Sequence, residues 1–303
     1  MIPFKIKDLG QLFKNAFKEW FAKDPFRQSA IIAYYAIFSI PGLLVLIIAI
    51  AGYFFGTDAV NKNLIDQIST TIGAETALQI KDVLSKSTRE KSTTWGSIIG
   101  ISILLIGATG VFVELQTTLN LIWNVKLKKQ NGFLKILKSR LFSFGLILAI
   151  AFLLTISLVI STALVAISNY IHFESSQIMM TIYGILNFVI SLAVISALFA
   201  MIFKILPDAK IEWKHVWLGS LVTGLLFTIG KMALAYYFGK AQPASVYGAA
   251  GSVILILLWV SYSSMILFFG AEFTAAFAKM YSGTIAPTAI AKVEVPTATQ
   301  KKM

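Results

Sequence analysis

The sequence contains no cysteine and few charged residues. The lack of cysteine excludes disulfides, thiolate nucleophiles and cysteine-ligated zinc. Only 13% of the 303 residues are charged, whereas a soluble domain carries roughly 25%. Hydrophobic residues make up 57% of the chain and the mean hydropathy is +0.79. So little charge could not cover the surface of a water-soluble globule, so the composition is typical of an integral membrane protein.

Acidic residues are scarce as well, with 14 against 26 lysines and arginines, which gives a net charge of +12. A basic chain of this kind can bind nucleic acid, but here the lysines lie in short segments between apolar runs. Basic residues in membrane proteins collect in cytoplasmic loops and face anionic lipid. We therefore expect membrane lipids as the partners of these residues, and no nucleic acid.

The apolar runs predict an all-α, polytopic membrane protein, because each run is long enough to cross a bilayer. Residues 1–24 come first and have an amphipathic pattern, with apolar and lysine-bearing faces, that predicts a cytoplasmic helix. This helix either lies at the headgroup boundary or packs on the bundle as an ordinary cytoplasmic helix. The six-span membrane domain is expected over 25–280, with spans at about 28–55, 95–123, 141–168, 178–203, 216–238 and 249–271.

Two further segments complete the predicted organisation. Residues 58–94 contain short amphipathic patterns and predict a helical loop on the outer side of the membrane. Residues 281–303 are rich in Thr, Ala, Pro and Lys without periodicity and are predicted to be a disordered tail. With six spans, the segments before the first span and after the last hold, with two loops, 19 lysines and arginines against six on the other side. The positive-inside rule therefore predicts both termini in the cytoplasm.

Two charged residues, Glu114 and Lys231, lie well inside predicted spans. Glu114 is about nine residues, or roughly 14 Å, from the cytoplasmic end of its helix, and Lys231 is roughly 11–12 Å from the outer end of its own. Both approach the midplane of a core about 30 Å thick, where an ionisable group is costly and functional. The two form a buried ion pair or line one polar cavity, or else Lys231 extends to the outer headgroups.

Other polar groups lie inside the predicted spans. Pro41 should kink the first span, because proline removes a helical hydrogen bond and frees the carbonyl of Ile37. A kink beside tyrosines and a serine either lines a cavity or is a packing feature. The candidate polar path through the membrane is Tyr34, Tyr35, Ser39, Glu114, Asn120, Asn187 and Lys231.

Enzyme chemistry is not indicated. His172 and His215 lie on opposite sides of the membrane in the predicted topology, so they cannot share a metal. No HExxH helix, P-loop or Gly-x-Ser-x-Gly turn is present. We expect no catalytic residues, no metal and no cofactor.

Several stretches resemble the YihY/virulence factor BrkB family. The first is Ala33-Tyr34-Tyr35-Ala36-Ile37-Phe38-Ser39-Ile40-Pro41 in the first span, and Leu119-Asn120 resembles the end of the second. Further positions resembling family motifs are Leu206, Pro207, Trp213, Gly219, Gly230, Lys231, Tyr247, Gly248, Ala249, Ala250, Gly251, Trp259, Gly270, Ala271 and Glu272. The chain departs from the family at Ser261, where a tyrosine is common, and at Phe273-Thr274, where leucine-asparagine is usual.

The resemblance implies a six-span protein of the bacterial inner membrane, linked to virulence and, in some members, to envelope lipids. The family has carried the label ribonuclease BN, but a metal-dependent nuclease needs a His/Asp cluster in water, which this chain lacks. Two functions stay open. The protein transports a solute or translocates lipid in the cell envelope, or it is a non-transporting scaffold or partner of envelope machinery. The sequence does not indicate its oligomeric state.

Overall fold

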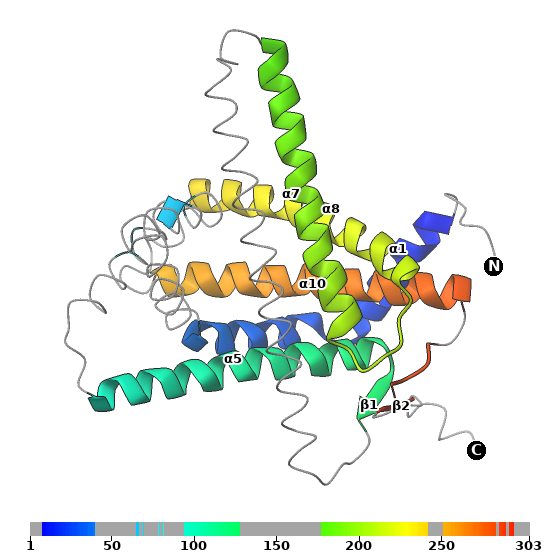
Figure 1. Ribbon diagram of the computed structural model, residues 1–303, viewed down its shortest axis with the longest axis horizontal. Helices are drawn as coiled ribbons and strands as arrows, with labels where there is room; N and C mark the ends of the chain where they lie inside the picture. The colour runs from blue at the N-terminus through cyan, green and yellow to red at the C-terminus, as the bar shows by residue number, and fades with distance from the viewer. Residues whose placement is uncertain are drawn as a thin grey trace. The chain divides into compact units, whose positions relative to one another are not determined.

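The computed structural model describes residues 8–39, 94–127, 177–241, 251–282, 285–288 and 291–293, with residues 65, 66, 69, 78 and 81. The predictions for the 141–168 span, for Pro41 and for Tyr247-Gly248 therefore lie outside the described residues, as does nearly all of the 58–94 segment. What the structure describes is almost entirely helical (Figure 1). The chain is thus an α-helical protein, as its hydropathy pattern predicts.

The helices and strands follow the predicted order. Helix α1 is Leu9–Ala22, α5 is Thr94–Ile122, α7 is Gln177–Ile205, α8 is Trp213–Ala241 and α10 is Gly251–Ser282. Residues 25–39 are also helical. Two short strands, β1 (Val125–Leu127) and β2 (Ala291–Val293), complete the list.

Three helices in the described part of the chain are long and apolar enough to cross a membrane. Their candidate spans are Gly184–Ile205, Trp213–Phe238 and Val253–Tyr281. The last differs from the sequence prediction, which ended the span at about residue 271, because α10 continues to Ser282. The total of six spans and the sidedness of the chain stay predictions.

The chain divides into two compact units. The first comprises Met1–Lys23, Gln116–Thr228 and Leu267–Met303, and the second comprises Asp24–Leu115 and Ile229–Ile266. Each unit has its own apolar packing. In the first, Leu12 and Ala16 of α1 are fully buried against Phe273 and Phe277 of α10. In the second, Phe238 of α8 packs on α10.

Helices α8 and α10 run side by side in opposite directions (Figure 1). In the first unit a Cβ added at Gly219 would lie 1.8 Å from Oγ1 of Thr274. One at Gly270 would lie 1.8 Å from Oγ1 of Thr223. Each threonine donates its hydroxyl hydrogen to the glycine four residues before it in its own helix, at 2.6 and 2.7 Å. Small residues allow such close approach in membranes, where no hydrophobic effect drives helices together.

The predicted disordered tail is wrong for residues 285–288 and 291–293. Strand β2 pairs antiparallel with β1, so that Val125 lies opposite Val293. Pro287 forms a bridge with Ala209, and Lys210 N–H donates to the Ala286 carbonyl at 2.8 Å. A segment without periodicity is therefore ordered by main-chain hydrogen bonds to residues far away in sequence.

Candidate functional site

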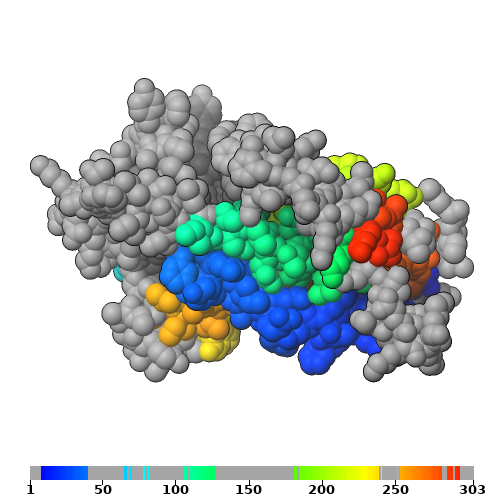
Figure 2. Space-filling model, turned by 90° about the horizontal axis from the view of Figure 1, so that it is seen from below, coloured from blue at the N-terminus to red at the C-terminus, as the bar shows by residue number. Residues whose placement is uncertain are grey.

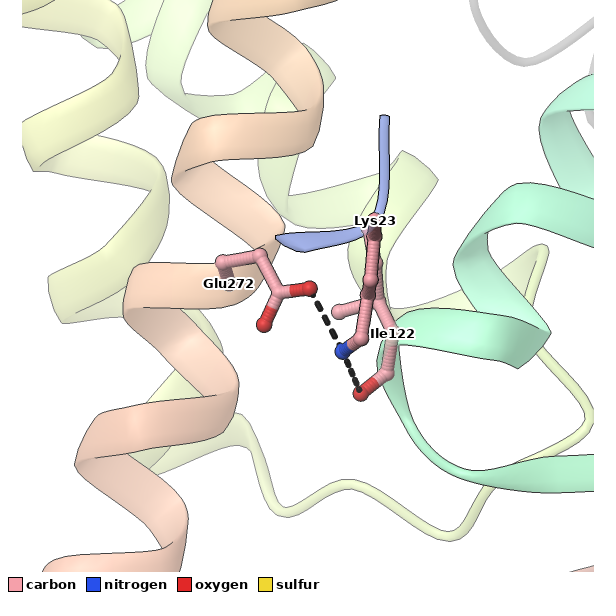
Figure 3. A network of polar contacts seen from close by, with 3 residues as sticks. All are labelled: Lys23, Ile122 and Glu272. Atoms are coloured by element: carbon pink, nitrogen blue, oxygen red, sulfur yellow. Dashed lines mark hydrogen bonds and ion pairs between the residues drawn. The ribbon is translucent and has the colours of Figure 1, made fainter. Parts of the chain in front are cut away.

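A buried ion pair joins α10 to the residue that follows α1 (Figure 3). Lys23 Nζ lies 2.6 Å from Oε1 of Glu272, whose side chain is only 2% exposed, while that of Lys23 is 15% exposed. The same ammonium donates to the carbonyl of Ile122 at 3.4 Å. Three elements that are distant in sequence therefore meet at a single cation.

The chemistry at the end of α5 explains why a lysine lies there. The last carbonyls of a helix have no partner within it and carry partial negative charge, so a cation near them is favourable. Ile122 is the last residue of α5. The chain then turns at Asn124, which has φ of 51°, and asparagine tolerates this left-handed conformation better than most residues. The ammonium of Lys23 thus satisfies both a carboxylate and a helix end.

A second polar cluster surrounds Asp208, in the loop between α7 and α8. Asn120 Nδ2 donates to Oδ2 of Asp208 at 2.8 Å, and Asp208 N–H donates to Oδ1 of Asn120 at 2.7 Å. Gln116, one turn earlier on α5, donates to the same carboxylate oxygen at 3.1 Å. The main chain of Thr288 donates to the Asp208 carbonyl at 3.0 Å. The C-terminal turn of α5 therefore holds the loop, and the C-terminal segment closes over it.

An exposed ion pair offers a contrast at the start of α8. Lys214 Nζ lies 2.5 Å from Oε2 of Glu212, and both side chains are exposed. The hydrogen bond from Lys214 lowers the pKa of the Glu212 carboxyl below its usual value. Exposed pairs of this kind contribute little to stability because water and salt screen them. The structural weight therefore lies with Lys23 and Glu272.

Glu114 and Lys231 both belong to the second unit, but no hydrogen bond or ion pair joins them in the described structure. The basic group that acts electrostatically on Glu114 is Arg27. Arg27 also pairs with Asp24 at 2.9 Å. Because an arginine beside the acid already supplies opposite charge, the predicted ion pair between Glu114 and Lys231 is not formed.

The other predicted path residues of the second unit pack between the 25–39 helix and α5. A Cβ on Gly110 would lie 2.4 Å from the ring of Tyr35, and one on Gly107 would touch the main chain at Ser39. Ser39 is buried and donates its hydroxyl hydrogen to the Ala36 carbonyl. Tyr34 points outward and is exposed, with ring contacts to Tyr35 and Phe38. Tyr35 and Ser39 are thus brought together with α5, and Tyr34 is not.

The first unit holds the two predicted asparagines. Asn120 is buried in the Asp208 cluster, whereas Asn187 is half-buried on a part of α7 whose neighbours Ile185 and Phe188 are exposed. The family-motif positions Pro207, Gly219, Gly251, Gly270 and Glu272 are all buried, and Trp259 is half-buried.

Several buried polar atoms have no hydrogen-bond partner within the described residues. Two hydroxyls lie in helices of the first unit, on Thr118 of α5 and Ser196 of α7, and one lies on Ser263 of α10 in the second. Ser196 Oγ lies against Gly224 of α8. The remaining atoms are Trp123 Nε1 and Thr288 Oγ1.

Sequence reasoning missed Lys23 and Asp208 as site residues. Lys23 is one of several lysines in an amphipathic segment, and no local pattern marks it as the partner of Glu272. Asp208 had a usable signal. It follows Pro207 in a family motif, and Gln116 and Asn120 share one helical face that can hold a carboxylate. Within the described residues, no group of three or more His, Asp or Glu side chains could hold a metal.

Comparison with known proteins identifies the family. The sequence pattern of the family described as virulence factor BrkB matches residues 16–292. The chain belongs to this family. The BrkB match includes Lys23, Asn120, Asp208 and Glu272, so both polar clusters lie inside the shared region.

Curated BrkB relatives are described as membrane proteins. The UPF0761 membrane protein of Saccharophagus degradans is 26% identical over 277 residues, covering 89% of this chain and 60% of the relative. That of Teredinibacter turnerae is 26% identical over 273 residues, covering 89% and 61%. One from Vibrio cholerae is 26% identical over 186 residues, covering 59% and 57%. The chain spans about three fifths of the length of the curated relatives it matches, and their names state no catalytic activity.

No solved structure matches this chain. The helical membrane architecture therefore follows from the apolar helices of the structure and from the family.

Proposed function

We propose that this protein transports a polar or amphipathic solute across the bacterial inner membrane, and that phospholipid is the first substrate to test. The proposal is carried by the buried hydroxyls of Thr118, Ser196 and Ser263, which lie in three helices without a protein partner in the described structure. A scaffold with a dry core has no need of such groups. A path for polar molecules uses them.

The physical reason is the cost of burying a polar group. A hydroxyl without a hydrogen bond in an apolar environment costs roughly 1–3 kcal/mol. In a bilayer, water does not relieve that cost unless the group lines a cavity. Hydroxyls that are buried by the helices and unbonded are consistent with a path whose polar occupant supplies the missing hydrogen bonds as it passes.

The proposed topology is the one that the sequence predicts. Six spans place the segments at both ends of the chain in the cytoplasm, on the side where lysines and arginines are most numerous. The buried pair Lys23–Glu272 and the Asp208 cluster then lie near the cytoplasmic surface. Their role in this proposal is to hold the cytoplasmic ends of α5 and α10 in place.

The test is leaflet exchange of a fluorescent phospholipid in liposomes that contain the purified protein. Wild type is compared with empty liposomes and with two variants, Ser196→Ala and Glu114→Gln. The matched control is Ser220→Ala, because Ser220 is as fully buried as Ser196 but its hydroxyl already donates to the Trp217 carbonyl in its own helix. We expect exchange above background in wild type and in Ser220→Ala, and slower exchange in the other two variants.

Exchange no faster than in empty liposomes would contradict phospholipid translocation. In that case the same liposomes, loaded with small ions and polar solutes, test transport of a different substrate class. Retention of every solute would favour the second function, a scaffold for envelope machinery. Equal loss of exchange in Ser196→Ala and Ser220→Ala would show that a path through Ser196 is not the explanation.

A further inference from the structure

The apolar sector of α1 is wider than the face that α10 covers. Leu12 and Ala16 are fully buried, and the ring of Phe13 lies 5.0 Å from that of Phe273. On a helical wheel these residues occupy one side, and Phe17 and Phe21 continue the apolar sector beyond it. The packing of the first unit therefore leaves part of this sector uncovered.

The uncovered part is an aromatic pair. Phe17 is 56% exposed and Phe21 is 62% exposed, although both are large apolar side chains. Their rings are stacked at a centroid distance of 6.3 Å, because residues four apart lie above one another on a helix. The surface of α1, dark blue in the space-filling view, reaches the outside of the molecule (Figure 2). Two stacked phenylalanines therefore form one exposed aromatic ridge.

Lysines flank the ridge. Lys14 is one turn before Phe17 and Phe21 is one turn after Lys18, so all four side chains lie on one side of α1. Both lysines are exposed, and neither forms an ion pair within the described residues. Glu19 lies on another side, where its charge acts on Glu272. The ridge thus has positive charge beside it and no acid.

A membrane surface is the partner that fits this arrangement. Helix α1 has 14 residues and includes two lysines and a glutamate, so it is too short and too charged to cross a bilayer. Aromatic side chains beside lysines are typical of helices that lie in the headgroup region. Lysines near anionic headgroups add to the attraction. The protein is a membrane protein, so a leaflet is always adjacent to it.

We propose that α1 is a lipid-binding element, in which Phe17 and Phe21 insert at the headgroup boundary and Lys14 and Lys18 bind the phosphates of anionic lipids. The helix is docked on α10 at the same time, because its buried and inserted faces are different. Lipid bound by α1 therefore acts directly on the helix that carries Glu272. This inference does not depend on whether the protein transports anything.

The absence of cysteine allows a direct test by spin labelling. Single variants Phe17→Cys, Phe21→Cys and Gln11→Cys are labelled with a nitroxide and reconstituted in vesicles of phosphatidylcholine and phosphatidylglycerol. Gln11 is the matched control, because it is exposed on α1 away from the ridge. Collision of the label with oxygen, which partitions into lipid, is compared with collision with a water-soluble nickel chelate.

We expect the ratio of oxygen to nickel collisions to be several-fold higher at positions 17 and 21 than at 11. Equal ratios at all three positions would overturn the proposal, since the ridge would then lie in water. Low collision rates with both reagents at 17 and 21 would also overturn it, because they would show a protein partner such as a second copy of the chain.

The charge part of the proposal has its own test. The double variant Lys14→Gln, Lys18→Gln is combined with Phe21→Cys and measured in vesicles with and without phosphatidylglycerol. With the lysines present, we expect anionic lipid to raise the collision ratio, and with both replaced we expect no difference between the lipids. A ratio that ignores both lipid composition and the lysines would overturn the assignment to anionic lipid. The thermal midpoint of each labelled protein should equal that of wild type, since every replaced side chain is exposed.

Discussion

The buried charged groups of the first unit are bonded to protein, whereas two of its buried hydroxyls are not. Glu272 has Lys23, and Asp208 has Asn120 and Gln116. Thr118 and Ser196, in helices of the same unit, have no partner among the described residues. Charges without partners would be far more costly than hydroxyls, so the fold satisfies them first. The comparison suggests that the charged groups stabilise the structure and that the hydroxyls serve the function.

The largest expected effect comes from breaking the buried pair. Glu272→Gln or Lys23→Met alone should lower the free energy of unfolding by about 3–5 kcal/mol, because the remaining charge is buried without its partner. The double variant should recover a large part of this loss. The measurement is a double-mutant cycle on unfolding in detergent micelles. Simple additivity of the two single effects would show that the pair is not coupled.

The next effect tests the contact between α8 and α10. Gly270→Ala should cost up to about 3 kcal/mol, because overpacking forces the helices apart and the new methyl would lie 1.8 Å from Oγ1 of Thr223. The control is Gly184→Ala on α7, where nothing lies within 4 Å of an added Cβ. That variant should be neutral or stabilising, since alanine favours helices more than glycine does. Thermal unfolding in micelles compares the two, and equal midpoints would contradict the close contact.

A smaller effect is expected at the Asp208 cluster. Asn120→Ala removes a donor to the carboxylate and the acceptor of the Asp208 N–H. The expected loss is about 2 kcal/mol, since buried groups are left without hydrogen bonds. Limited proteolysis of the loop between α7 and α8 should also become faster. Unchanged cleavage and stability would mean that Gln116 and Thr288 hold the loop without Asn120.

The smallest effect on stability is expected at the unpartnered hydroxyls. Ser196→Ala should change the free energy of unfolding by no more than about 0.5 kcal/mol, because no hydrogen bond is lost. Ser220→Ala should cost more, since its hydroxyl bonds to the Trp217 carbonyl. Calorimetry or thermal unfolding of the two variants decides this. A large loss for Ser196→Ala would place that hydroxyl with the structural groups.

Hydropathy and periodicity predicted the helices well and the polar contacts poorly. The span predicted at 95–123 is α5, and that at 178–203 is α7, because long apolar runs specify helices by themselves. Pairing between side chains depends on how the helices pack, which hydropathy does not encode. Glu114 was therefore assigned to Lys231, while Arg27, in the next turn after a helix start, was overlooked.

The tail shows the same limit for strands. Ala291–Val293 has three residues, and only its pairing with Val125–Leu127, about 165 residues earlier, makes it a strand. No local pattern could have revealed that partner. Glu272 was identified through the family motif, but its lysine was not, because the two residues are separated by most of the chain.

The reciprocal glycine–threonine contacts limit how α8 and α10 can move. Sliding one helix by a turn in one direction would bring Thr223 against Thr274, and in the other direction it would leave Gly219 facing Gly270 across a gap. Neither register packs as closely as the observed one. These parts of α8 and α10 therefore behave as one rigid body, and any alternating-access motion has its moving boundary elsewhere.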